Sequence, residues 1–216
     1  MPFSSRLRLP AAVLVLGLAL AGCSSGGRQS ATTPSPSLSP SPSPSSTVDV
    51  PQGVSLTAVG ADLSFGDSAT VIYEPNQKSG TVLRLTVQQA TKGTVKDFKG
   101  FILDDYTKES TPYYVDVKVE NVGEGEVGRT PVPLWGVDAD NTLLPAATFT
   151  TSFPRCESDK LPKRFESGDS FKTCLVYLAP DHGELKAVSF RPNQEFDPIQ
   201  WTGDIAVEKA KAGKKG

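Results

Sequence analysis

The chain has 216 residues, of which 38% are hydrophobic and 21% are charged, and its formal net charge is −2. That length suits one domain with accessory segments. A mildly acidic chain lacks the basic field that neutralises phosphates, so we expect no nucleic-acid partner.

The first 22 residues are typical of a bacterial signal peptide. Arg6 and Arg8 give a positive start, and an apolar run of ten residues, AAVLVLGLAL at 11–20, follows them. A helix of that length rises about 15 Å, which is half of a hydrocarbon core and too short for a membrane span. The run has the size of a signal-peptide hydrophobic region, so we predict that residues 1–22 are removed.

Leu20, Ala21 and Gly22 stand directly before Cys23. These four residues resemble the lipobox of bacterial lipoproteins. The resemblance implies that Cys23 is the lipidation site, with a diacylglycerol on its sulfur and a further acyl chain, such as palmitate, on its amine. Membrane lipid would then hold the exported chain at the outer face of the bacterial cytoplasmic membrane, at about 0.8 kcal/mol per buried CH₂. A secretory signal that ends in a chance cysteine is the alternative.

Residues 23–53 are predicted to be the lipidated N-terminus and a disordered stalk. Among the 18 residues at 30–47, 16 are Ser, Thr or Pro and none is charged. Such a segment cannot bury enough apolar surface to offset the cost of ordering. Its alternating Ser-Pro steps favour polyproline II, which makes a semi-stiff spacer. O-glycosylated and unmodified stalks both remain open.

Residues 54–207 are predicted to form an antiparallel β-sandwich. In the run at 112–122, Tyr113, Val115, Val117 and Val119 alternate with polar or larger side chains, which is the period of a half-buried strand. Further strands are predicted at 70–73, 81–87, 133–139, 170–178, 185–191 and 199–201. Seven or eight strands without helices between them predict an all-β sandwich. Residues 208–216, EKAKAGKKG, are predicted to be a basic, disordered tail.

Three segments carry a resemblance to a known family. They are YYVDVKVENVG at 113–123, LWGVDADN at 134–141 and GDSF at 168–171. Each resembles a strand and turn in a family of immunoglobulin-like bacterial lipoproteins of unknown function, related to the secreted immunogenic immunoglobulin-like proteins of mycobacteria. The resemblance extends from about residue 60 to residue 191. It implies an immunoglobulin-like β-sandwich and assigns no catalytic residues.

Cys156 and Cys174 remain as a pair if Cys23 is lipidated. Outside the membrane a disulfide persists, so we predict that these two cysteines are joined. The bond would stabilise the fold by about 3 kcal/mol and fix a polar loop to a strand. Two free thiols or a metal-binding pair are the alternatives.

The sequence offers no complete catalytic set, so we expect a non-enzymatic protein with no cofactor. The run FGDS at 65–68 resembles the nucleophile block of GDS-type esterases, but that chemistry needs an imidazole, and the only histidine, His182, lacks the accompanying aspartate. Asp138, Asp140 and Asn141 offer oxygen atoms that could bind calcium. An Asp-Asn pair is also a common hairpin tip, and we predict no metal site there.

The loop at 148–165 is the predicted recognition surface, because loops placed by a rigid scaffold often bind partners. Its candidate binding residues are Phe149, Phe153, Arg155 and Phe165, although aromatic residues in a sandwich more often belong to the core. We therefore expect a membrane-anchored module that binds a protein or envelope component. The alternative is a lipoprotein that binds a small ligand or metal ion and serves a membrane transporter.

Overall fold

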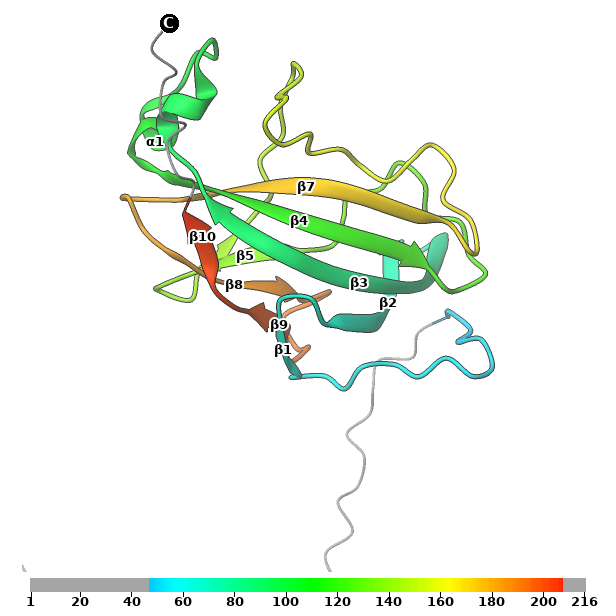
Figure 1. Cartoon of the computed structure of the whole chain (residues 1–216). Helices are drawn as coiled ribbons and strands as arrows, with labels where there is room; N and C mark the ends of the chain where they lie inside the picture. Colours follow the sequence, from blue (N-terminus) through cyan, green and yellow to red (C-terminus); the bar gives the residue numbers. More distant parts are fainter. Residues whose placement is uncertain (1–46, 208–216) are drawn as a thin grey trace, which may run out of the picture. The chain divides into compact units, whose positions relative to one another are not determined.

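Two β-sheets face each other in the computed structural model, which describes residues 47–207 (Figure 1). The predicted signal peptide, Cys23 with its lipobox, nearly all of the Ser/Pro-rich stretch and the tail at 208–216 lie outside the described residues. The described strands form a β-sandwich, as the alternating sequence pattern predicts.

The first sheet contains the longest strands, and we call it the β3–β4–β7 sheet. Its members are β2 (Ser68–Asn76), β3 (Ser79–Lys92), β4 (Thr111–Asn121), β7 (Ser170–Ala179) and β10 (Ile205–Val207). Strands β3, β4 and β7 pair antiparallel along most of their length. Strands β2 and β10 share the other edge of β3, with β2 along its first half and β10 at its end.

The second sheet is built from shorter strands, and we call it the β5–β8–β9 sheet. Its members are β1 (Asp62–Ser64), β5 (Trp135–Asp138), β6 (Leu143–Leu144), β8 (Leu185–Phe190) and β9 (Ile199–Thr202). Their order is β1-β9-β8-β5-β6, so the first strand of the described chain pairs with the ninth.

The strand number and the pairing differ from the prediction in two respects. The described residues form ten strands where seven or eight were expected, and the β1–β9 and β10–β3 pairs are parallel. Strands β1, β6 and β10 have only two or three residues, which is too short to show a period of two. Between β3 and β4 lie a 3₁₀ turn, η1 (Val95–Phe98), and a five-residue helix, α1 (Asp105–Glu109). No helix in the part of the chain described is long and apolar enough to cross a membrane.

The main core fills the space between the two sheets. Trp201 on β9 and Tyr177 on β7 are fully buried within it. Burial of their polar atoms is compensated, because the Trp201 indole N–H donates to the carbonyl of Asp67 at 3.0 Å and the Tyr177 hydroxyl donates to the carbonyl of Leu134 at 3.1 Å. Gly136 lies against Tyr177, and a Cβ atom there would come within 3.0 Å of the ring. The aromatic rings therefore fix the spacing of the sheets.

A buried asparagine closes one end of the sandwich. The Asn121 side chain is 1% exposed and donates to the carbonyls of Gly125 and Phe165 at 2.7 and 2.9 Å. Its amide oxygen accepts from the Thr81 hydroxyl at 2.7 Å and from the Gly123 N–H at 3.2 Å. One side chain thus joins β3, the turn after β4 and the loop before β7, which accounts for an asparagine at the end of the strand.

Three buried tyrosines predict a loss of stability in alkali. Burial raises the pKa of Tyr73, Tyr114 and Tyr177 above the ordinary value of 10.0. Below that pH these phenols are neutral in both states, but above it only the unfolded chain ionises freely. The free energy of unfolding should therefore fall as the pH rises beyond about 10. Denaturant titrations across that range would measure it, and tyrosinate absorbance that develops fully before unfolding would contradict the assignment.

Candidate functional site

A polar groove lies on the outer face of the β3–β4–β7 sheet, beside the loop that precedes β7. Its volume is about 700 Å³. Strands β3, β4 and β7 supply one side of it, and residues 154–157 supply the other. The lining residues are Gln88, Gln89, Asp116, Pro154, Arg155, Cys156, Glu157, Lys172, Thr173 and Cys174.

A β-bulge gives the groove two neighbouring amide side chains. Val87 pairs with Val117 and Gln89 pairs with Asp116, which leaves Gln88 as an extra residue in β3. Gln88 and Gln89 are both exposed and both line the groove, whereas a regular strand would turn one of them into the core. The Gln89 amide donates to the Asp116 carboxylate at 2.6 Å. Bulges are common beside functional sites because they redirect a side chain in this way.

The loop predicted as a recognition surface forms the wall of this groove and covers part of the sheet. Phe149 and Phe153 stack on each other with ring centroids 4.9 Å apart, and Phe153 stacks on Phe98 at 5.1 Å. Phe101 completes this aromatic group, which is a small second core on the outer side of the sheet.

Two of the candidate binding residues are therefore packing residues in this structure. Phe153 is 4% exposed within the second core, and Phe165 is 1% exposed within the main core. The expectation that both present contact surface is corrected, because a partner cannot reach either ring. Phe149 is half-buried, and Arg155 remains exposed at the groove.

The predicted disulfide between Cys156 and Cys174 is confirmed, with Cα atoms 5.2 Å apart. It joins the loop to β7 at the floor of the groove. The Thr173 hydroxyl adds a second connection by donating to the carbonyl of Glu157 at 3.1 Å. The position of residues 154–157 relative to the sheet is therefore fixed covalently.

Removal of the disulfide, in a Cys156→Ala/Cys174→Ala double variant, should lower the free energy of unfolding by about 3 kcal/mol, because the unfolded chain regains the freedom of an 18-residue loop. Equilibrium denaturation with and without a reductant would measure the difference. The wild type under reduction should approach the double variant, and the double variant should not respond to the reductant. Equal stability of the oxidised wild type and the variant would contradict this account.

Arg155 lies over the ring of Tyr114, with its guanidinium carbon 4.8 Å from the ring centroid. The Tyr114 hydroxyl donates to the Asp97 carboxylate at 2.9 Å. Burial, helped by Asp97, raises the pKa of Tyr114, so the phenol keeps its proton at neutral pH. The hydrogen bond to Asp97 fixes the ring of Tyr114, and the cation–π contact with that ring orients Arg155.

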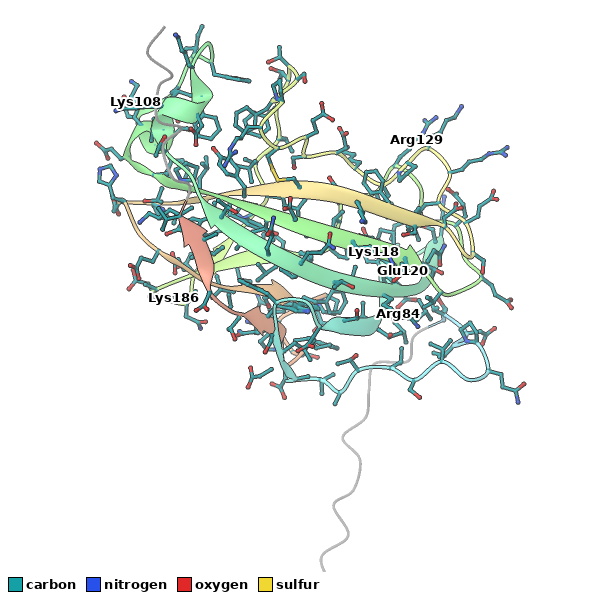
Figure 2. The ribbon with its side chains drawn as sticks, in the orientation of Figure 1. Arg84, Lys108, Lys118, Glu120, Arg129 and Lys186 are labelled. Atoms are coloured by element: carbon teal, nitrogen blue, oxygen red, sulfur yellow. A yellow bond between two sulfur atoms is a disulfide. The ribbon has the colours of Figure 1, made fainter. Side chains whose placement is uncertain are left out.

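Charged side chains of both signs surround the two glutamines. Arg155 and Lys172 are positive, whereas Asp116 and Glu157 are negative. Along the same face of β4, Lys118 and Glu120 form an ion pair at 2.9 Å, next to Arg84 on β3 (Figure 2). Such a surface can hold a polar partner through hydrogen bonds and ion pairs.

The groove residues on the strands are ones that sequence reasoning missed. Gln88 and Gln89 interrupt the alternation between Val87 and Ala90, and this break was the available signal for a bulge. Asp116 and Lys172 look like ordinary solvent-facing strand residues in the sequence. They line the same groove only because β4 pairs with β7.

Asp138, Asp140 and Asn141, the residues considered as calcium ligands, lie in the hairpin between β5 and β6. One carboxylate oxygen of Asp138 accepts from the N–H groups of Asp140 and Thr142 at 2.9 and 2.7 Å. Asn141 adopts the left-handed conformation, with φ of 61°, that a tight turn requires. Within residues 47–207 no three His, Cys, Asp or Glu side chains are grouped so that they could hold a metal ion.

Comparison with known proteins gives one structural likeness. No protein-family model matches the chain, and no curated protein sequence matches it significantly. A secreted protein from Mycobacterium tuberculosis, MPT63, has a crystal structure that superposes with a TM-score of 0.46 at 11% sequence identity. The superposition covers 68% of this chain and all of that one.

Proposed function

We propose that this protein is a lipid-anchored module outside the cytoplasmic membrane that binds a protein or another envelope component through the polar groove. The observation that carries the proposal is the construction of the groove. A bulge supplies two exposed amides on one side, and a disulfide-held loop supplies Arg155 and Glu157 on the other.

The proposed location outside the cytoplasmic membrane rests on the resemblance of residues 20–23 to a lipobox and is supported by the disulfide. Cys156 and Cys174 are joined, and such bonds persist in oxidising compartments but are rare where thiols are kept reduced. With these two cysteines paired, Cys23 is the remaining thiol of the chain, directly after the predicted signal. The Ser/Pro-rich stretch would then separate the lipid from the sandwich.

The proposed mode of action is binding without catalysis. The groove offers donors and acceptors from Gln88 and Gln89 and charges of both signs from Arg155 and Lys172 against Asp116 and Glu157. Hydrogen-bonding groups of this kind orient a polar partner. Charges at the edge of a binding surface mainly change the rate at which the partner associates. The covalent bond at the groove floor reduces the ordering cost of binding.

A crosslinking experiment tests the groove as the binding surface. A photoreactive amino acid replaces Gln88 in the full-length protein in intact cells, and the matched control carries it at Lys186, an exposed position on β8 of the other sheet. We expect a crosslinked product from the Gln88 position that is absent from the Lys186 position. Lys172→Glu should reduce its yield several-fold, because it reverses a charge at the groove. Identical products from both positions would contradict the proposal.

A further inference from the structure

Four residues form one cross-strand row on the outer face of the β5–β8–β9 sheet. Trp135 on β5 pairs with Ser189 on β8, Ser189 pairs with Gln200 on β9, and Gln200 pairs with Asp62 on β1. Directly paired residues point to the same face of a sheet. With strands about 4.8 Å apart, three steps give a row about 14 Å long.

The alternation along each strand places this row outside the core. The neighbouring row contains Trp201, Val188 and Leu63, which pack in or against the main core. Successive residues of a strand point to opposite faces, so the row with Trp135 faces outward. This sheet is opposite the one that carries the groove, so a site here is independent of the proposed function.

The polar members of the row have no partners in the described part of the chain. The side chains of Asp62, Gln200 and Ser189 make no hydrogen bond or ion pair within residues 47–207. The Ser189 hydroxyl is fully buried and still unpaired, which is costly for a polar atom. The Asp62 carboxylate and the Gln200 amide are thus available to a ligand, whereas the Ser189 hydroxyl lies covered between Gln200 and Trp135 in the row.

Trp135 gives the row an aromatic end. It is 38% exposed, whereas Ser189 and Ala187 on the adjacent strand are 0% and 3% exposed. An indole that is partly open to solvent beside polar groups offers a ligand an apolar surface and a ring N–H.

We propose that this row is a binding site for a neutral oligosaccharide. The C–H face of a sugar ring packs on the electron-rich face of an indole, and its hydroxyl groups both donate and accept hydrogen bonds, which matches the amide of Gln200. The Asp62 carboxylate accepts hydrogen bonds from sugar hydroxyl groups and repels anionic polymers. A row about 14 Å long fits an extended chain of several sugar rings better than a single small molecule.

Calorimetric titration of the full-length protein tests this site, in a detergent without sugar headgroups. The probes are cellotetraose and tetra-N-acetylchitotetraose. We expect saturable binding of at least one, and a loss of at least about tenfold in affinity in Trp135→Ala, with partial retention in Trp135→Phe. Gln200→Ala should also weaken binding, whereas Ile102→Ala, which alters a fully exposed apolar residue remote from this sheet, should leave it unchanged.

Three outcomes would overturn the site. The first is no binding of either tetrasaccharide to the wild type at about 10 mM. The second is equal binding by Trp135→Ala, with folding verified by the emission of the buried Trp201. The third is tighter, Trp135-dependent binding of a polyuronate, which would show that the ligand is an anionic polymer. Absence of the crosslink at Gln88 together with intact sugar binding would contradict the proposed function of the groove but not the sugar site.

Discussion

Replacing Trp201 by alanine should lower the free energy of unfolding by about 3–5 kcal/mol. The indole is fully buried, and β9 lies between β8 and β1, so the cavity is enclosed on both sides by paired strands. The loss also removes the hydrogen bond to the carbonyl of Asp67, which links β9 to the turn before β2. Denaturant unfolding followed by far-ultraviolet circular dichroism would measure the change.

Trp135→Ala is the matched control for this prediction. Both tryptophans are strand residues of the same sheet, but Trp135 is 38% exposed and Trp201 is not exposed at all. We expect the Trp135 variant to lose less than about 1.5 kcal/mol, because a half-exposed side chain forfeits less transfer free energy and leaves no closed cavity. Comparable losses in the two variants would contradict the assignment of Trp201 to the core.

Asn121→Ala should lower the free energy of unfolding by roughly 2–5 kcal/mol. The substitution leaves the buried Thr81 hydroxyl without its acceptor, and it removes the donor that the carbonyls of Gly125 and Phe165 share. Each orphaned buried group costs about 1–3 kcal/mol, and the bonds of one network do not add independently. Thermal and denaturant unfolding would both report the effect.

Asn193→Ala provides the control for Asn121. Asn193 is exposed, and its side chain accepts a local bond from the N–H of Glu195. Its removal should change stability by less than about 0.5–1 kcal/mol. If Asn121→Ala were as mild as this control, the junction of β3, β4 and the loop before β7 would not depend on the asparagine.

The long strands were predictable because their side chains alternate. In β4, Val115, Val117 and Val119 face the core while Asp116 and Lys118 face outward, as the period of two requires. The short strands β1, β6 and β10 were not predictable, since two or three residues show no period. Strands β1 and β10 also pair with segments far apart in the chain, whereas β6 pairs with the adjacent β5.

The candidate site was predictable only in part, for related reasons. The pairing of Cys156 with Cys174 followed from the expected compartment, and the structure confirms it. The burial of Phe153 did not follow, because its partners Phe98 and Phe101 come from the connection between β3 and β4. Sequence spacing cannot reveal that two distant loops fold over the same face of a sheet.

The two sheets offer chemically different outer surfaces. The groove on the β3–β4–β7 sheet combines amides with charges of both signs, whereas the row on the β5–β8–β9 sheet ends in an exposed indole. The groove is the proposed site for a protein or envelope component, and the row is the proposed site for an oligosaccharide. The crosslinking and titration experiments separate these roles, because the crosslink at Gln88 and the Lys172 variant probe the first sheet, whereas the Trp135 and Gln200 variants probe the second.

Intact-mass and peptide mass spectrometry of the protein isolated from its own membranes tests the central claim most directly. We predict a mature chain that begins at Cys23, with two acyl chains on a glycerol joined to its sulfur and the amine free or acylated. A chain that retains Met1, or one with an unmodified thiol at Cys23 and no membrane association, would contradict the account.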